Sequence, residues 1–425
     1  MLKKFVATIF AATLFANSAV QASAEDLMLE DPLASEGFND RFLNKYPVNN
    51  PENNPENNSE ENPEENFSNE NSETENIPNS TKDEKPVEIV ETPPPQVEGE
   101  GLEFHVYHKN GVMAFAVIAD HERYTLRHIL AKDQISGRET VSQMTADLAD
   151  IAMINAGYFM KNGSLIGVEK IDGEIIAKDD FYRSAIGISE DGAVIFGRVR
   201  YSGEIEYYGE IFPIYGVNCE RGENSLVLYN SYFGATTGTN DFGVEVVVEG
   251  GMITNIFYDK GNNTIPAGGY VISAHGTAAD FLKTMHVYDM VNINQQIISE
   301  DGNFNDMPNV IGAGPRLVMD GKVFVTADAE QFPKDIRVGR APRSAIGVNQ
   351  YGDYIFAVVD GRQAHSKGCT LQEWAEILLN DFGAVNAINL DGGGSTELIV
   401  KDQLVNKPSD GKERAVGSAL AIIPR

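Results

Sequence analysis

Short runs of apolar residues, separated by glycine-containing turns, recur along the chain after residue 101. The run at residues 168–176 is broken at Asp172-Gly173, the run at 185–196 is broken at Asp191-Gly192, and residues 244–248 form a third. Valine, isoleucine, tyrosine and phenylalanine favour strands, and Asp-Gly pairs are typical of hairpin turns. The pattern therefore predicts a fold made mainly of β-strands.

Helical patterns are few. Thr370 and Glu373 have the spacing of a capping box, and apolar residues recur at helical spacing from 371 to 379. Shorter helices are expected at residues 277–285 and at about 140–149. Strands with a few helices, and without a regular alternation of the two, predict an α+β fold in one strand-rich domain.

One pentapeptide occurs twice. Arg-Ser-Ala-Ile-Gly stands at residues 183–187 and again at 343–347, and each copy is followed by a turn and another strand-like run. Two related units are too few for a solenoid. We expect two related half-units that pack together, with the active site between them.

The beginning of the chain has the features of a secretory signal at residues 1–24. Lys3 and Lys4 precede an apolar stretch at 5–15, and small residues end at Ala24. The apolar stretch is too short for a stable membrane span. We expect cleavage near Ala24 and a protein that is secreted or located in the periplasm or cell envelope.

Residues 25–100 are rich in Asn, Glu and Pro. They hold 21 acidic and 4 basic residues of a chain whose formal net charge is −30. Such a segment buries too little apolar surface to offset its conformational entropy, so a disordered linker is expected. The folded domain is then expected at residues 101–425.

The composition and several missing motifs exclude some classes of function. The folded part is also acidic, which argues against nucleic acid as a partner. No GxxxxGK[ST], GxSxG or HExxH motif is present. Cys219 and Cys369 fit no metal-binding spacing and either pair with each other or remain separate thiols. The sequence leaves the oligomeric state open.

The strongest chemical candidate lies at residues 387–396, where an apolar strand runs into an aspartate and three glycines. Successive glycines let the backbone approach a ligand closely and expose N–H groups. Glycine amides and neighbouring hydroxyls suit phosphate oxygens, and the carboxylate suits an acid, a base or a cation ligand. The alternative is a tight turn between strands. The residues are Asp391, Gly392, Gly393, Gly394, Ser395 and Thr396.

Three further segments have weaker signals. A second apolar strand ends in Asp360-Gly361-Arg362, and Arg362 with Arg343 offers bidentate geometry to a phosphodiester, or else forms a salt-bridged turn. The other candidates for contacts with a sugar are the residues Asn155 and Tyr158, and the polar loop with Thr239 and Asn240 that follows Asn230. His275 and His365 are the best placed of the seven histidines.

Taken together, these motifs resemble the phosphodiester glycosidase family. The resemblance runs from about Asn155 to the C-terminus. It includes Asn-x-Gly-x-Phe at 155–159, Arg-x-Ala-Ile-Gly at 343–347, Asp-Gly at 360–361, the helix at 371–379, Asn-Leu-Asp-Gly-Gly-Gly-Ser at 389–395 and the tail around Asp410 and Arg414. The segment 364–370, which contains Ser366, departs from the family pattern and is expected to alter substrate fit.

The resemblance implies a hydrolase that cleaves the bond between the anomeric carbon of a sugar, an α-linked N-acetylhexosamine, and a phosphate. The substrates it implies are envelope glycopolymers or exopolysaccharide. The catalytic candidates are Asp391, Asp360 and Glu169. The candidates for binding sugar or phosphate are Asn155, Tyr158, Arg183, Asn230, Thr239, Asn240, Arg343, Arg362, Ser366, Gly392, Gly393, Gly394, Ser395 and Thr396.

As a hypothesis, Arg343 and Arg362, with the glycine amides and Ser395, hold the phosphate, while Asp360 or Asp391 acts as base or nucleophile. No cofactor is predicted, although clustered acids could hold a divalent cation. Two other classes remain open: an envelope protein that binds glycan without cleaving it, and an ordinary glycoside hydrolase that needs no phosphate.

Overall fold

The computed structural model describes residues 101–145 and 151–425. The expected signal peptide and acidic linker lie outside these ranges, and so does the end of the helix expected at 140–149. Within the described ranges, no helix is long and apolar enough to cross a membrane.

Antiparallel sheets account for most of the fold, as the hairpin pattern predicts. The first sheet has the order β1 (Leu102–Lys109), β2 (Val112–Ala119), β22 (Tyr354–Val359), β21 (Arg343–Val348), β23 (Asn386–Asn389), β19 (Arg316–Met319) and β20 (Lys322–Val323). The second has the order β25 (Gln403–Leu404), β24 (Leu398–Val400), β4 (Ala152–Asn155), β26 (Ser418–Pro424) and β3 (Tyr124–Leu130).

Two more sheets follow. The third has the order β11 (Glu210–Pro213), β10 (Val194–Tyr207), β9 (Arg183–Ile188), β18 (Asn309–Gly312), β7 (Glu169–Ile171) and β8 (Glu174–Ala177), with β17 (Asn292–Ile298) paired to β10. The fourth has the order β12 (Gly216–Val217), β13 (Leu226–Tyr229), β16 (Tyr270–Ala274), β14 (Val244–Glu249) and β15 (Met252–Tyr258). A small hairpin joins β5 (Tyr158–Phe159) to β6 (Leu165–Ile166).

The described helices are short, apart from one. They are α2 (Val141–Thr145), α3 (Thr277–Leu282), α4 (Lys334–Arg337), α5 (Leu371–Asn380) and the 3₁₀ turns η1 (Ala131–Asp133), η2 (Phe304–Asp306) and η3 (Gly393–Ser395). The capping box predicted for α5 is confirmed, because Thr370 and Glu373 bond each other reciprocally. The helix expected at 277–285 ends earlier, at Leu282.

The main core lies where the first three sheets meet. Strand β22 is apolar at every position because both of its faces are buried. Phe356 and Val358 pack into the main core with Ile186 of β9 and Leu420 of β26. The alternate residues of β22 pack on the other face of the first sheet, which α5 covers through Trp374 and its apolar neighbours.

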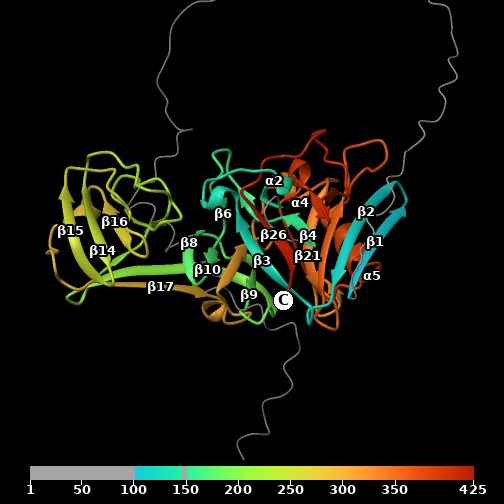
Figure 1. Ribbon diagram of the computed structural model, residues 1–425, viewed down its shortest axis with the longest axis horizontal. Coiled ribbons are helices and arrows are strands. Elements are labelled where there is room, and N and C mark those ends of the chain that lie inside the picture. Colours follow the sequence, from blue (N-terminus) through green and yellow to red (C-terminus); the bar gives the residue numbers. More distant parts are fainter. Residues whose placement is uncertain (1–100, 146–150) are drawn as a thin grey trace, which may run out of the picture. The chain divides into compact units, whose positions relative to one another are not determined.

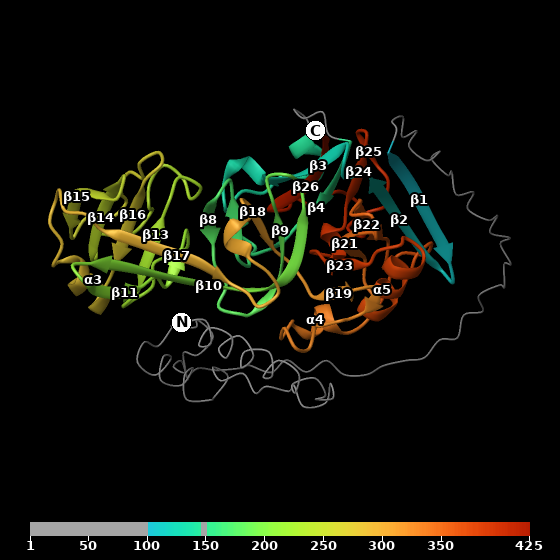
Figure 2. The same cartoon turned by 90° about the horizontal axis from the view of Figure 1, so that it is seen from below.

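The fourth sheet has a core of its own and is joined to the rest by two long strands. Strand β10 has 14 residues; residues 194–199 pair with β9, residues 204–207 pair with β11, and residues 200–206 pair with β17. Figures 1 and 2 show β10 and β17 running from β9 to the region of β14–β16. This region, residues 201–298, is called the β-lobe below.

The predicted hairpins at 168–176 and 185–196 are confirmed as β7–β8 and β9–β10. The repeated pentapeptide forms β9 and β21, and Ile186 and Ile346 share the main core. That the chain contains two duplicated half-units stays a prediction. The open question of the cysteines is answered, since Cys219 and Cys369 are both free thiols.

Candidate active site

The ends of four strands meet at one edge of the first two sheets. Strand β21 is antiparallel to β22 and β23, so Arg343 lies beside Val359 and the start of β21 faces the end of β23. The backbone after β23 crosses to β4, because the Asp391 N–H donates to the carbonyl of Ala156 at 3.0 Å. The candidate residues on these strands, far apart in sequence, are therefore neighbours in the fold.

Asn155 holds this junction together rather than offering a free amide to a sugar. Its side-chain N–H donates to the Asp391 carbonyl at 2.7 Å. Its side-chain oxygen accepts from the Ser344 hydroxyl at 2.7 Å and from the Glu397 N–H at 3.2 Å. Asn155 is only 1% exposed. Because a buried amide of this kind is costly to leave unpaired, we assign Asn155 to the framework of the site.

Asp391 is half-buried at the end of β23. Burial raises the pKa of its carboxyl to about 6, although hydrogen bonds from Ser395 and the Gly392 amide, and the charge of Arg414, act in the opposite direction. A carboxyl that titrates near 6 can exchange a proton close to neutral pH. Asp391 thus has the position and the acidity of a catalytic group.

The three glycines after Asp391 allow close contacts that no side chain would permit. A Cβ at Gly393, which has a φ of +64°, would lie 3.3 Å from Nη1 of Arg362, and a Cβ at Gly394 would overlap the guanidinium of Arg414. The backbone amides of the three glycines differ in their hydrogen bonds. Those of Gly392 and Gly393 donate to the Asp391 carboxylate and the Pro342 carbonyl, whereas that of Gly394 has no acceptor among the described residues.

Two arginines flank this loop. Arg362 is exposed, adopts a left-handed φ of 60°, and has no hydrogen-bond or ion-pair partner among the described residues. A non-glycine residue in that conformation carries strain of a kind that is common at functional sites. Arg414 is bound to the Asp410 carboxylate at 2.6 Å and reaches the Ser395 hydroxyl at 3.4 Å. The loop therefore has two guanidinium groups within reach.

The predicted role of Arg343 as a phosphate clamp is not supported. Its side chain is 3% exposed. Its guanidinium donates to the carbonyls of Cys369, Ile336 and Gly339 at 3.1 to 3.3 Å. Arg343 instead joins the segment before β21 to the start of α5, and Arg362 is the arginine that the structure leaves open to a ligand.

Asp360 also differs from the prediction, because its carboxylate is enclosed. It is 2% exposed and accepts hydrogen bonds from His365 at 2.9 Å, from the Lys407 amide at 2.9 Å and from Asn406 at 3.3 Å. Burial raises its pKa, while these bonds lower it. A buried carboxylate bound to one ring nitrogen fixes the orientation of a half-buried histidine. Asp360 is therefore a positioning residue for His365.

Glu169 is fully buried, which does not favour its predicted role as a third catalytic acid. One carboxylate oxygen accepts from the Gly312 amide at 3.1 Å, and the other lies 3.9 Å from Nε2 of His128. Burial raises the pKa of Glu169 well above its usual value and lowers that of His128 to about 3. Burial thus favours the neutral form of each group, in the interior behind Gly157.

Tyr158 and Arg183 line a narrow, mainly apolar recess beside the site. The Tyr158 hydroxyl donates to the Gly314 carbonyl at 2.7 Å and accepts from Asn389 at 3.0 Å, and burial together with the Asp391 charge raises its pKa. The Arg183 guanidinium lies between the rings of Phe181 and Phe332, 4.2 and 4.7 Å from their centroids. Both predicted residues are engaged in contacts made within the protein, and Tyr158 adjoins the Asp391 loop through Asn389.

Three hydroxyl groups of the predicted site are buried. The Ser366 hydroxyl donates to the Asp360 carbonyl at 2.6 Å and accepts from the Met113 amide at 3.0 Å, so it supports the turn that contains Arg362. Ser395 is engaged by Asp391 and Arg414. Thr396 is 1% exposed, and its hydroxyl has no partner among the described residues.

The remaining predicted residues belong to the β-lobe, and their bonds join them to that lobe and to β8. Asn230 bonds Asn218, Glu174 and the Ile175 carbonyl. The Thr239 hydroxyl donates to Glu245 at 2.6 Å, and Asn240 accepts from Arg221 at 2.7 Å. The structure therefore does not bring these three residues into the group around Asp391.

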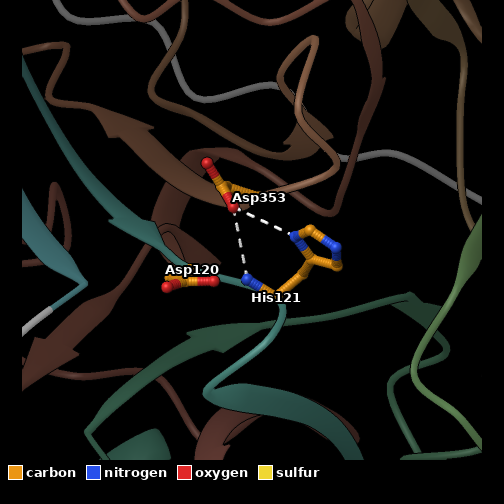
Figure 3. Close-up of side chains that lie close together, drawn as sticks. All are labelled: Asp120, His121 and Asp353. Atoms are coloured by element: carbon orange, nitrogen blue, oxygen red, sulfur yellow. Dashed lines mark hydrogen bonds and ion pairs between the residues drawn. The ribbon is translucent and has the colours of Figure 1, made fainter.

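A cluster of Asp120, His121 and Asp353 has the ligand types of a cation site (Figure 3). It lies at the opposite end of β22 from Asp360. One Asp353 oxygen already accepts from the His121 ring at 3.2 Å and from its backbone N–H at 3.3 Å. Asp120 accepts from the Glu122 amide and lies 3.4 Å from Arg123. These bonds tie two turns together, and we assign the cluster that structural role.

Sequence reasoning missed three groups near the site. Arg414 lay in a segment quoted for the family resemblance but was given no role. His365 and Asp360 were each named as candidates, but their pairing was not predicted, although a spacing of five residues across a turn could have suggested it. Phe181 and Phe332 could not be identified from the sequence, because an aromatic residue in a loop has the same sequence pattern whether it packs on Arg183 or is exposed to solvent.

Comparison with known proteins supports the predicted family. The family model described as phosphodiester glycosidase matches residues 242–423. An uncharacterized SPbeta prophage-derived protein, YomE, of Bacillus subtilis (strain 168) is 36% identical over 139 residues, 33% of this chain and 20% of that protein. The human N-acetylglucosamine-1-phosphodiester alpha-N-acetylglucosaminidase is 36% identical over 104 residues, 22% of this chain and 20% of that protein.

A crystal structure of a hypothetical protein from Synechocystis is similar with a TM-score of 0.66 and 27% identity, over 77% of this chain and 62% of that one. The chain spans about a fifth of the length of the curated relatives it matches. The matched residues include Arg362, Asp391 and Arg414. The predicted resemblance is thus confirmed, because residues 242–423 of this chain match the phosphodiester glycosidase family model.

Proposed function

We propose that this chain hydrolyses the bond between the anomeric carbon of a sugar and the phosphate of a phosphodiester. The family match supports the class of reaction. The observation that carries the proposal is the half-buried Asp391, with a pKa of about 6, at the head of a glycine loop flanked by the unpaired Arg362 and by Arg414.

Arg362 is the group that binds the phosphate. Its guanidinium lies against Gly393, where no side chain intervenes, and its planar N–H groups match two phosphate oxygens at once. The free amide of Gly394 is a further donor to the same anion. Arg414, held by Asp410, adds positive charge on the other side of the loop. These groups stabilise the negative charge that the departing phosphate carries.

Asp391 acts in its ionised form. A phosphate leaves an anomeric carbon readily without protonation, so the site has more need of a base or nucleophile than of an acid. An ionised carboxylate beside the anomeric carbon stabilises the positive charge that develops on the sugar, and either attacks it or activates water. Asp360 contributes through His365, whose ring it holds in place.

The substrate we propose carries an α-linked N-acetylhexosamine, since the human relative is named for an N-acetylglucosamine-1-phosphodiester. The signal-like residues 1–24 support a substrate outside the cytoplasm, in an envelope glycopolymer or an exopolysaccharide.

A panel assay tests the proposal. The full chain and its Asp391→Asn variant are incubated with N-acetylglucosamine-1-phosphodiester and with an aryl N-acetylglucosaminide that lacks phosphate, and binding is measured in parallel. We expect cleavage of the phosphodiester alone, reduced by about 10²-fold or more in Asp391→Asn. Cleavage of both substrates favours an ordinary glycosidase, and binding without cleavage favours a glycan-binding protein; either result overturns the proposal.

A further inference from the structure

The β-lobe contains a pocket that the Asp391 site does not use. Its cavity measures about 280 Å³ and is lined by Arg221, Gly222, Glu223, Asn240, Phe242 and His275. This size is close to the lower end of the range for ligand sites in proteins. The pocket also includes Asn240, a residue that the sequence singles out and that the hydrolytic site leaves without a role.

The framework beneath the pocket is rigid and polar. Glu245 is 1% exposed, and its two carboxylate oxygens accept from Thr239, Ser273 and Asn263, among others. Ser273 in turn accepts from Arg221 at 2.8 Å. Arg221 also donates to the side chain of Asn240 at 2.7 Å. Because each group is fixed by another, the pocket is organised before any ligand arrives.

The lining keeps several groups available for a ligand. The side-chain NH₂ of Asn240 and the carboxylate of Glu223 have no partner among the described residues. The His275 ring also lines the pocket. The ring of Phe242 is 68% exposed and lies 6.5 Å from the His275 ring, in an edge-to-face arrangement. An exposed aromatic face is costly in water unless something covers it.

We propose that this pocket binds one sugar ring of a glycan chain, at a site separate from the hydrolytic one. A pyranose has an apolar face that stacks on an aromatic ring, and hydroxyl groups that pair with amide, imidazole and carboxylate groups. A phosphate fits less well, since Arg221 already donates to Asn240 and Ser273 and the Glu223 carboxylate repels an anion. The pocket would hold the polymer while the Asp391 site cleaves it.

Phe242 gives the sharpest test, because its side chain is largely exposed and its removal leaves the core intact. N-acetylglucosamine, N-acetylgalactosamine, glucose and galactose are each titrated into the full-length chain, with saturation-transfer NMR as the readout. We expect at least one sugar to bind. Phe242→Ala should raise the Kd of that sugar by about threefold to tenfold. Phe242→Tyr should retain binding. Tyr288→Ala is the matched control, since Tyr288 is 78% exposed in the same lobe but does not line the pocket.

The test separates this inference from the proposed hydrolysis. Phe242→Ala should cleave a small N-acetylglucosamine-1-phosphodiester at the wild-type rate, and Asp391→Asn should still bind the sugar in the β-lobe. The inference is overturned if none of the four sugars binds, or if Phe242→Ala and Tyr288→Ala bind equally well. Loss of sugar binding in Asp391→Asn would also overturn it, because it would place the sugar in the hydrolytic site.

Discussion

Single residues with similar sequence signals have different roles in this protein. Asp360 and Asp391 both follow an apolar strand, and Arg343 and Arg362 both stand near a strand end, so the sequence treats each pair alike. In the structure, the two members of each pair differ in burial and in hydrogen-bond partners. Asp360 and Arg343 are enclosed by hydrogen bonds, whereas the Arg362 side chain has none to any part of the chain that the structure describes, and Asp391 keeps a half-buried carboxyl. Which member of each pair is enclosed depends on tertiary packing, which local spacing does not encode.

The acidity of Asp391 predicts a pH dependence. Since burial raises its pKa to about 6 and the ionised form is the active one, kcat/KM for a sugar-1-phosphodiester should be constant above that value. It should fall as the pH drops through about 6. The profile is measured with wild type and with Asp391→Asn, whose residual activity should lack this acidic limb. If both proteins lose activity over the same acidic pH range, the loss is due to a titratable group other than Asp391.

The two arginines predict opposite results for the same substitution. Arg362→Lys should lower kcat/KM by about tenfold or more, because a point charge replaces a bidentate donor, and should leave the Tm unchanged. Arg343→Lys should lower the Tm by several degrees, because buried carbonyls lose their donors. Thermal unfolding and steady-state kinetics of both variants check this. A kinetic defect without loss of stability in Arg343→Lys would restore that residue to the phosphate site.

At the level of elements, the predicted hairpins and α5 are correct because their signals are local. The Asp-Gly turns and the capping box involve residues a few positions apart, and such contacts form whatever the rest of the fold does. The pairing of β21 with both β22 and β23, which assembles the site, joins residues far apart in sequence. Periodicity identifies the strands but does not determine their neighbours in a sheet.

The close packing of the glycine loop at η3 predicts that an added Cβ at one position lowers activity. Gly394→Ala should displace the Arg414 guanidinium, which occupies the space of the added methyl group, and so lower turnover of the phosphodiester. Gly222→Ala is the control for turnover of a small phosphodiester, because its Cβ would meet only Ser225 at 3.6 Å and Gly222 lies in the β-lobe rather than in the hydrolytic site. Kinetics of both variants, with thermal unfolding to verify folding, make the comparison. Equal activity in the two variants would mean that the position of Arg414 is unimportant.

For the molecule as a whole, the acidic composition does not reveal which acids lie in the interior. Glu397 is 0% exposed, and burial raises its pKa to about 8, against hydrogen bonds from the amides of Arg414 and Val141. The folded protein therefore holds a proton that the unfolded chain releases. Its stability should decline as the pH rises from about 4.5 to 8.

Glu397→Gln tests this decline, because the amide stays neutral and keeps an oxygen for the same donors. The variant should have a Tm several degrees above wild type at pH 8 and a similar Tm near pH 5. Glu190→Gln, an exposed change on the β9–β10 turn, is the control. If the two Tm curves of Glu397→Gln and wild type are parallel over this range, Glu397 is ionised in the folded protein and the account of its burial is wrong.

The most direct test of the whole account is a crystal structure of Asp391→Asn with a bound N-acetylglucosamine-1-phosphodiester. The account predicts the phosphate between the Arg362 guanidinium and the Gly394 amide, with the anomeric carbon facing residue 391. A phosphate that is bound elsewhere, or an anomeric carbon that faces away from residue 391, would contradict it.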